Sequence, residues 1–305
     1  MNLLLFLGAG FSVEAGLPTQ KEFWKHASEH PQISQYAKTI IDQIFYETAL
    51  SSSDIPTIEN AFSFIDFLYY MKYDDFNISM FFPPIHEVSV LKARNTFLRV
   101  IELVYSYNRA EEMYINHALY DVFFKKLLKS NHTAIITTNY DLICESILNR
   151  LPGGKAILFP IINKDYKFGG AYIPAPLLKL HGSVDWKETN FDVPNIIPPT
   201  WSKRFERRGK YNYIWNQAEY AINVSDKIVF IGYSMPKLDI HIRYLIKLGL
   251  LNSENKKEVY VVKPTWNNED EENYNFINNH ANIKSLKSIK MGFKQFAESD
   301  MNQIL

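Results

Sequence analysis

Short, largely apolar runs recur along the chain and are separated by longer stretches of mixed character. The first, Leu3 to Leu7, ends at Gly8, and similar runs occupy residues 133–137, 228–231 and 259–262. Such runs are typical of strands buried on both faces, as in a parallel sheet. Helices are expected after two of these strands, at about 140–150 and 238–250. The pattern predicts an α/β fold with a Rossmann-like parallel sheet flanked by helices.

Residues 20–130 follow a different pattern, in which apolar residues recur at helical spacing. This segment predicts a large all-helical module inserted between the first and second strands of the sheet. Residues 1–19 and 131–305 would then form the Rossmann-like domain. Residues 266–282, rich in Asn and Glu, are expected to form a solvated loop or a short helix. The helical spacing is carried by Phe62, Ile65, Leu68, Tyr69, Leu98, Ile101, Val104, Leu119, Phe123 and Leu127.

Composition and charge narrow the classes of function. Lys plus Arg and Asp plus Glu each number 33, so the formal net charge is zero and no direct nucleic-acid binding is expected. We find no signal peptide and no apolar stretch of about 18 residues, so no membrane association is expected. The single cysteine, Cys144, excludes a disulfide framework and a Cys-based zinc site within one chain. A reducing cytoplasm is therefore the expected compartment.

A glycine-containing segment directly follows the first predicted strand. Glycines at this point let the backbone approach a diphosphate closely, while the next helix offers its N-terminal N–H groups. The Gly-x-Gly pattern alone is weak evidence, because a tight strand-to-helix turn also favours glycine. Its position after the first strand is what makes it a candidate phosphate loop. The segment consists of Gly8, Ala9, Gly10, Phe11 and Ser12.

Residues 8–18 extend this loop to Gly-Ala-Gly-x-Ser-x-x-x-Gly-x-Pro, which resembles the sirtuin (silent information regulator) family. Further segments agree in their order along the chain. Residues 137–141, Thr-Thr-Asn-Tyr-Asp, look like the family's Thr-Gln-Asn-Ile-Asp motif. Residues 179–183 look like its His-Gly motif, and residues 232–234 are similar to its Gly-Thr-Ser segment near the adenosine half of NAD. The resemblance implies a Rossmann-type domain that binds NAD as a substrate.

The chain also departs from the deacylases of that family. Deacylases carry zinc-binding cysteines, so the single cysteine here implies no zinc module and no metal. Their Phe-Arg-Ser is replaced by residues 20–23, and Thr138 stands where the family usually has Gln. With the helical insert and the segments 195–201 and 232–236, the chain resembles zinc-free sirtuin-like domains of prokaryotic antiphage defence. Lys263 occupies a position where relatives often have an Asn that contacts the adenosine ribose, and its role is left open.

The resemblance implies roles for individual residues. Asn139 would orient the ribose and a water molecule, Asp141 would hold the nicotinamide carboxamide, and His181 would act as general base. Without the motifs, a single His after a strand is more often structural, and an Asn-x-Asp pair is more often a helix cap. Further cofactor contacts are implied at Gly8, Ala9, Gly10, Phe11, Ser12, Pro18, Thr19, Thr138, Gly232, Tyr233, Ser234 and Asp239.

The expected function is that of an NAD glycohydrolase, which produces nicotinamide and ADP-ribose or a cyclic isomer. In the defence branch, the implied role is an effector that depletes NAD. Two alternatives stay open: an NAD-dependent protein deacylase or ADP-ribosyltransferase, and a non-catalytic NAD-sensing scaffold. Besides NAD, the expected partners are further copies of the chain in a homo-oligomer. A second protein of the defence system is also expected, such as a translocase-type ATPase or an Argonaute-like protein.

Overall fold

The structure is a computed structural model in which the described residues form two compact units. Unit 1 comprises Met1–Leu17, Asn108–Gly182 and Phe205–Leu305, and unit 2 comprises Pro18–Tyr107 and Ser183–Arg204. These units divide the chain at other points than the expected 1–19, 20–130 and 131–305. The described residues are 2–35, 38, 57–73, 87–106, 117–130, 132–151, 157–158, 176–187, 193–200, 208–237, 239–301 and 304.

Unit 1 is built on a seven-stranded sheet with the order β3-β4-β2-β1-β7-β8-β9. All of its described pairings are parallel, which confirms the predicted sheet. β1 lies in the middle, and its residues Leu3 to Leu7 are almost completely buried. The strands are β1 (Asn2–Leu7), β2 (His132–Thr137), β3 (Ile157–Leu158), β4 (Pro176–Lys179), β7 (Lys227–Ile231), β8 (Lys257–Lys263) and β9 (Ile283–Lys290).

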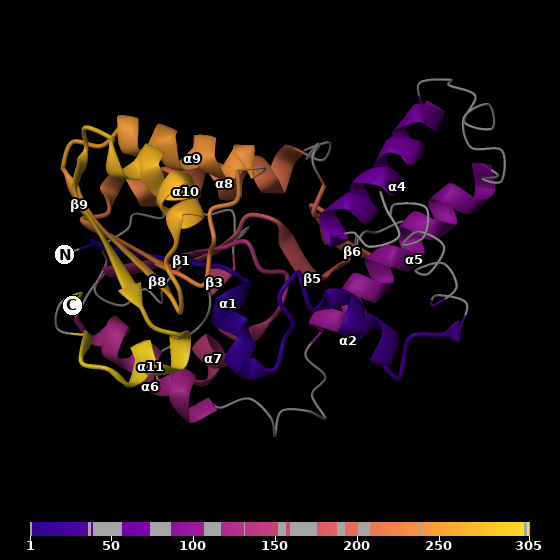
Figure 1. Ribbon diagram of the computed structural model, residues 1–305, viewed down its shortest axis with the longest axis horizontal. Coiled ribbons are helices and arrows are strands. Elements are labelled where there is room, and N and C mark those ends of the chain that lie inside the picture. Colours follow the sequence, from indigo (N-terminus) through magenta and orange to yellow (C-terminus); the bar gives the residue numbers. More distant parts are fainter. Residues whose placement is uncertain are drawn as a thin grey trace. The chain divides into compact units, whose positions relative to one another are not determined.

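Helices cover both faces of this sheet, as the Rossmann-like prediction requires. One face carries α8 (Arg208–Val224), α9 (Ile240–Leu251) and α10 (Asn268–Asn278) (Figure 1). The other carries α6 (His117–Ser130), α7 (Ile143–Arg150) and α11 (Phe293–Glu298). The helices expected at 140–150 and 238–250 are therefore α7 and α9. A four-residue helix, α1 (Ala9–Ser12), and a 3-10 turn, η1 (Val13–Ala15), follow β1.

The Asn- and Glu-rich stretch 266–282 was predicted to be a solvated loop or a short helix. It contains the 11-residue helix α10. Asn267 explains where this helix begins, because its side chain accepts a hydrogen bond from the Asp270 backbone N–H at 3.0 Å. The Asp270 carboxylate in turn accepts from the Asn267 backbone N–H at 3.1 Å. This reciprocal capping box satisfies donors that the first helical turn would otherwise leave without partners.

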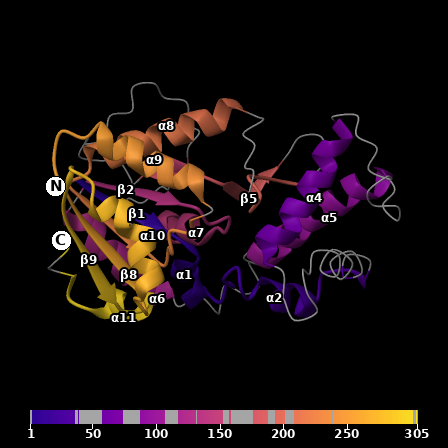
Figure 2. The same cartoon turned by 45° about the horizontal axis from the view of Figure 1, so that its top comes forward.

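Unit 2 contains helices α2 (Phe23–Glu29), α4 (Ile58–Tyr73) and α5 (Glu87–Tyr105). It also contains strand β6 (Pro194–Ile196) and all of strand β5 (Gly182–Lys187) except its first residue, which belongs to unit 1. Helices α4 and α5 lie side by side and run in opposite directions (Figure 2). Phe62 stacks on Phe97 with ring centroids 5.1 Å apart, and the Arg94 Nε donates to Asp66 at 3.0 Å. The helical spacing predicted for these segments is thus observed, with the apolar positions forming the contact between the two helices.

Helix α6 belongs to unit 1, although the sequence pattern assigned its residues to the helical insert. Its apolar side contacts α7, α11 and β2, and Phe123 packs on Phe293 of α11 with ring centroids 5.1 Å apart. A helical period shows that a helix has an apolar face but does not show which element covers that face. The periodicity of residues 119–127 therefore predicted the helix without predicting its unit.

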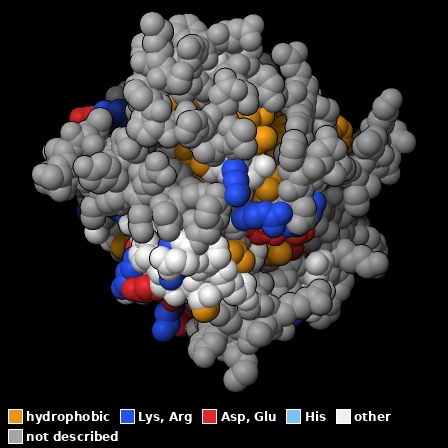
Figure 3. All heavy atoms as spheres, turned by 90° about the vertical axis from the view of Figure 1, so that its right-hand side faces the viewer, with side chains coloured by type: hydrophobic (Ala, Val, Ile, Leu, Met, Phe, Trp, Pro, Cys, Tyr) orange, Lys and Arg blue, Asp and Glu red, His pale blue; other side chains and the backbone are white. Residues whose placement is uncertain are grey.

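The surface of the described residues does not narrow the choice among the functions that the sequence left open. Among the described residues, no helix combines the length and the apolar character needed to cross a bilayer. The described part of the face in Figure 3 carries basic and acidic side chains beside hydrophobic ones. The charge of that part is therefore mixed rather than of one sign.

Candidate active site

The predicted site segments of unit 1 follow the carboxyl ends of neighbouring strands. Strand register aligns Leu7 with Thr137 and with Ile231, and Thr137 with Lys179. The loops after β1, β2, β4 and β7 therefore start at one edge of the sheet. This edge is where open parallel sheets bind their ligands. Pro18 and Thr19, the remaining predicted contacts, belong to unit 2.

The glycines of the loops after β1 and β7 are required by the contact between these two loops. The Gly10 backbone N–H donates to the Gly232 carbonyl at 3.0 Å, and the Gly8 N–H donates to Ile231 at 3.0 Å. A Cβ on Gly232 would lie 2.5 Å from the Gly10 backbone, and a Cβ on Gly8 would lie 2.6 Å from the Gly232 oxygen. Gly232 also has a φ of 62°, which favours glycine. Close loop packing is thus one observed reason for the Gly-x-Gly pattern.

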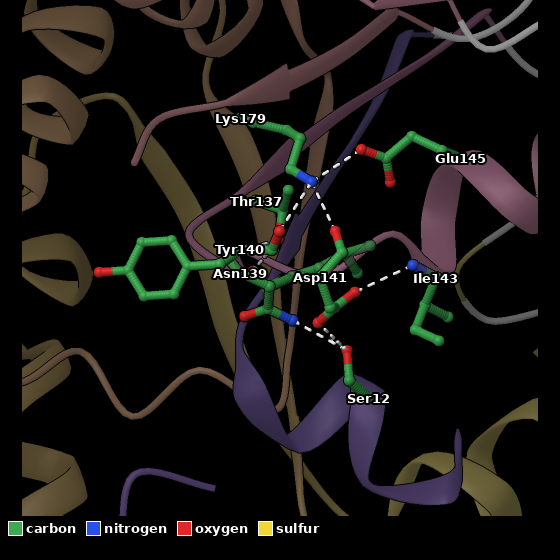
Figure 4. Close-up of polar contacts among 9 residues, drawn as sticks. Ser12, Thr137, Asn139, Tyr140, Asp141, Ile143, Glu145 and Lys179 are labelled. Atoms are coloured by element: carbon green, nitrogen blue, oxygen red, sulfur yellow. Dashed lines mark hydrogen bonds and ion pairs between the residues drawn. The ribbon is translucent and has the colours of Figure 1, made fainter. Parts of the chain in front are cut away.

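Asn139 and Asp141 both form hydrogen bonds with Ser12 of α1 (Figure 4). The Asn139 Nδ2 donates to the Gly8 carbonyl at 3.0 Å and to the Ser12 Oγ at 3.1 Å. The Ser12 hydroxyl donates to the Asp141 Oδ2 at 2.8 Å, and the Ile143 backbone N–H donates to the other carboxylate oxygen at 3.0 Å. Figure 4 shows the Asn139 carboxamide oxygen pointing away from Ser12. The amide is therefore oriented by its nitrogen, and Asp141 also accepts from the first backbone N–H of α7.

A buried lysine lies behind this segment. Lys179, at the end of β4, is 1% exposed, and its Nζ donates to the backbone carbonyls of Asp141 and, at 3.3 Å, of Tyr140. It also pairs with the Glu145 carboxylate at 2.7 Å. Burial raises the pKa of Glu145, and the neighbouring ammonium of Lys179 opposes this rise. Burial also raises the pKa of the Cys144 thiol well above its usual value, so this cysteine stays an uncharged core residue.

His181 lies in the turn between β4 and β5 and is 6% exposed. The turn is closed by Gly182, whose φ of 81° favours glycine. The preceding carbonyl, on Leu180, accepts a hydrogen bond from the Trp215 indole N–H at 3.1 Å, while the Leu180 N–H donates to Thr137 at 3.0 Å. The His181 ring centroid is 6.3 Å from that of Tyr140. The candidate base is thus next to the segment that carries Asn139.

The side chain of Phe11 belongs to the core. It is completely buried and contacts Tyr120 and Phe123 of α6 and Phe293 of α11, with ring centroids 5.1, 6.3 and 4.7 Å away. The Tyr120 hydroxyl donates to the Phe11 carbonyl at 2.7 Å. Among the predicted cofactor contacts, Phe11 can therefore contribute only backbone atoms.

Tyr233 and Asp239, also predicted as cofactor contacts, are buried and bonded to each other. The Tyr233 hydroxyl donates to the Asp239 Oδ2 at 2.7 Å, and its ring packs on Phe6 at 4.9 Å. Burial raises the pKa of Tyr233 well above its usual value, with Asp239 contributing to the rise. The Tyr274 hydroxyl donates to the Tyr233 carbonyl at 2.7 Å. These side chains fix the shape of the loop after β7, whereas Ser234 is exposed.

Three further predicted positions have hydrogen-bond or ion-pair partners within their own unit. Lys263 pairs with Asp270 of the α10 capping box, so its observed partner is a carboxylate of the same unit. Thr19 donates from its backbone N–H and its hydroxyl to the Glu22 carboxylate, at 3.0 and 2.9 Å. Thr138 is partly exposed, and its backbone N–H donates to Leu7 at 3.3 Å. Within the described residues, no three His, Cys, Asp or Glu side chains are grouped to hold a metal ion.

Sequence reasoning gave no role to Lys179 or Glu145. A signal was present, because Lys179 interrupts the apolar run of residues 176–180 two positions before His181. A lysine inside a buried strand requires a partner, since an unpaired buried charge is strongly unfavourable. Glu145 lies in the first turn of α7. Its pairing with Lys179 could not be predicted without knowing that β4 lies beside β2.

Comparisons with known proteins point to one family. The sequence profile described as "SIR2-like domain" matches residues 133–285, about half of the chain. Among curated proteins, none matches the sequence. A solved structure of Sir2Tm bound to a propionylated peptide is 14% identical, covers 97% of this chain and 90% of its own, and has a TM-score of 0.40. A second, on the mechanism and regulation of Sir2 enzymes, is 12% identical, with 97% and 89% coverage and a TM-score of 0.41.

Proposed function

The chain belongs to the family of SIR2-like domains, and we propose that it cleaves NAD at the bond between nicotinamide and ribose. The products are nicotinamide and ADP-ribose or a cyclic isomer. One observation carries the proposal. The segment with Asn139 and Asp141 and the turn with His181 follow adjacent strands, and the ring of Tyr140 lies 6.3 Å from that of His181. Family membership supports the use of NAD.

To cleave this bond, the protein must orient NAD and stabilise positive charge on the ribose. Breaking the glycosidic bond builds positive charge on the ribose in an oxocarbenium-like transition state. Asp141 supplies a negative charge that favours such a cation, and Ser12 and the Ile143 N–H orient its two oxygens. Each carboxylate oxygen keeps a lone pair with which it can accept an N–H of the nicotinamide carboxamide.

Asn139 and His181 act on the attacking group. The nitrogen of the Asn139 amide is held by Gly8 and Ser12, so its oxygen is left as the acceptor that orients a ribose hydroxyl or a water molecule. An imidazole at His181 accepts the proton of that hydroxyl or water. A positioned base of this kind typically accelerates a reaction by roughly 100- to 10,000-fold.

Two other functions were left open by the sequence. A protein deacylase or ADP-ribosyltransferase would need an acceptor protein, and the replacement of Phe-Arg-Ser at residues 20–23 disfavours deacylation. A non-catalytic NAD-sensing scaffold was favoured by the departures at Thr138 and Lys263. The pairing of Lys263 with Asp270 gives the second departure a structural reason, which weakens the argument for a scaffold.

Incubation of the purified protein with NAD as the sole organic substrate separates these functions. Nicotinamide and ADP-ribose, or its cyclic isomer, are expected to appear together, as measured by liquid chromatography with mass detection. Nicotinamide release only after addition of an acylated peptide or an acceptor protein would instead establish a transferase or deacylase. Binding of NAD without any release of nicotinamide, at every protein concentration and in every assembled state, would establish a scaffold.

The proposed biological role is that of a defence effector in the cytoplasm whose cleavage of NAD is switched on by assembly. Unregulated loss of a central cofactor would harm the cell that makes the enzyme, so an inactive state is expected. Activation would come from self-association into a homo-oligomer or from a partner such as a translocase-type ATPase or an Argonaute-like protein. Specific activity is expected to rise with protein concentration together with the mass measured by light scattering. Full turnover by a monomer at all concentrations would exclude this regulation.

A further inference from the structure

Lys179 is a buried, charged residue in a strand that is otherwise apolar. It is the last residue of β4 and 1% exposed, among residues that are otherwise apolar. A charged ammonium has three N–H donors. Three acceptors surround it: the carbonyls of Tyr140 and Asp141 and the Glu145 carboxylate. The lysine therefore links β4 to the loop after β2 and to the first turn of α7.

Stability alone does not account for this arrangement. Two charges must leave water to form the pair, and a well-packed apolar pair in their place is often at least as stable. The Glu145 Oε2 also has no hydrogen-bond partner among the described residues, so the pair is not fully compensated. What the ammonium supplies, and an apolar residue would not, is two hydrogen bonds to carbonyls in the segment between Asn139 and α7.

The two sides of the proposed active site meet at this residue. Lys179 precedes His181 by two positions, and the carbonyls it contacts belong to Tyr140 and Asp141, directly after Asn139. A change in the length or direction of this contact would shift the Asn139 segment relative to His181. Displacements of about 1 Å in an active site can lower the rate of the chemical step by about 100-fold.

We propose that Lys179 is a positioning residue, which holds the segment Asn139–Asp141 in register with His181, and that Glu145 is its counter-ion. The proposal rests on the proposed NAD cleavage for its effect on rate. Its structural half, the anchoring of the segment, does not depend on the reaction. The counter-ion is needed because a lone ammonium would oppose the positive charge that develops on the ribose, whereas the Lys179–Glu145 pair is neutral as a whole.

Three variants separate positioning from folding. Lys179→Met leaves the buried Glu145 carboxyl without its counter-ion, so it is expected to lower stability. The double variant K179M/E145Q removes both charges and is expected to recover much of that stability, while still lacking the two carbonyl contacts. The matched control is Lys257→Met, which removes an equally buried lysine that donates to the carbonyls of Asn223 and Ser225, outside the site. This control is expected to keep the wild-type kcat.

Kinetics and hydrogen exchange give independent measurements on these proteins. For K179M/E145Q, kcat is expected to fall by about 100-fold while KM for NAD changes by less than about 3-fold. Backbone amides in residues 138–143 are expected to exchange faster than in the wild type, as measured by mass spectrometry, with the rest of unit 1 unchanged. If the double variant does not fold, Lys179→Gln, whose amide retains an N–H donor, takes its place with the same expected directions.

A double variant with wild-type kcat, or with unchanged exchange in residues 138–143, would overturn the proposal. If the wild-type protein releases no nicotinamide from NAD in any assembled state, the proposed function fails. The exchange rates of residues 138–143 then decide on the anchoring role alone: faster exchange in K179M/E145Q supports it, and unchanged exchange refutes it.

Discussion

The hydroxyl of Ser12 donates a 2.8 Å hydrogen bond to the carboxylate of Asp141, 129 residues further along the chain. Ser12 also accepts from Asn139, so a single hydroxyl orients both polar side chains of the loop after β2. Because Ser12 ends α1, the candidate phosphate loop and the candidate catalytic loop form one hydrogen-bonded assembly. Substitutions in either loop should therefore disturb the other.

Asn139→Ala and His181→Ala are each expected to lower the release of nicotinamide from NAD by at least about 100-fold, since each removes an orienting group or a base. Both variants should remain folded, as followed by circular dichroism. His26→Ala serves as control, because His26 is an exposed residue of unit 2. Folded variants that both turn over NAD at the wild-type rate would show that the site is assigned to the wrong residues.

Gly232→Ala is expected to destabilise the protein far more than Gly16→Ala. Both glycines have positive φ, 62° and 82°, and alanine costs about 1–2 kcal/mol in such a conformation. At Gly16 a Cβ meets open space, whereas at Gly232 it would lie 2.5 Å from the Gly10 backbone. The second penalty should bring the loss at Gly232 to about 3–5 kcal/mol in urea denaturation. Equal losses for the two variants would contradict the close packing of the loops.

The lowered pKa of Lys257 predicts that the free energy of unfolding rises with pH. Burial lowers its pKa to about 8 in the folded state, against an ordinary value of 10.5. Between these values the unfolded chain binds more protons, so the free energy of unfolding increases with pH. A neutral amine keeps two N–H donors, which match the carbonyls of Asn223 and Ser225. From pH 7.5 to 9.5 the wild type should gain up to about 2 kcal/mol relative to Lys257→Met. A constant difference between the two proteins over this range would refute the lowered pKa.

Activity is expected to be the same before and after dialysis against EDTA. The single cysteine, Cys144, cannot form a Cys-type zinc site and is buried in the core. The proposed cleavage relies on a leaving group that is already cationic and needs no Lewis acid. Nicotinamide release and the circular dichroism spectrum are the two measurements. Joint loss of both in EDTA, with recovery on addition of zinc, would reveal a metal that holds the fold together.

The central strands were predictable from sequence, and the edge strands were not. β1, β2, β7 and β8 are buried on both faces, so their composition alone marks them. β9 lies at the edge of the sheet and places lysines between its apolar residues, which reduces the hydrophobic signal. β4 contributes few residues and contains Lys179. Edge and short strands are defined by their neighbours, which a sequence window does not contain.

The site shows a similar division. The motifs indicated which loops meet at the sheet edge, because parallel strands align their carboxyl ends. They did not indicate which side chains turn inward: Phe11 fills an aromatic cluster, and Tyr233 and Asp239 bond to each other. The partner of Lys263 was equally hidden, since it depends on the cap of a helix that sequence reasoning left as a loop or short helix. Side-chain direction follows from packing across the whole unit.

The central position of β1 has a consequence for biosynthesis. Its neighbours in the sheet are β2 and β7, and the contact between Asn2 and Asp226 spans 224 residues. Ribosomes add roughly 5–20 residues per second, so the apolar run Leu3–Leu7 waits on the order of ten seconds or more for its second partner. Such long-range pairing also slows folding itself. During translation, this nascent apolar strand therefore offers a binding segment for a chaperone.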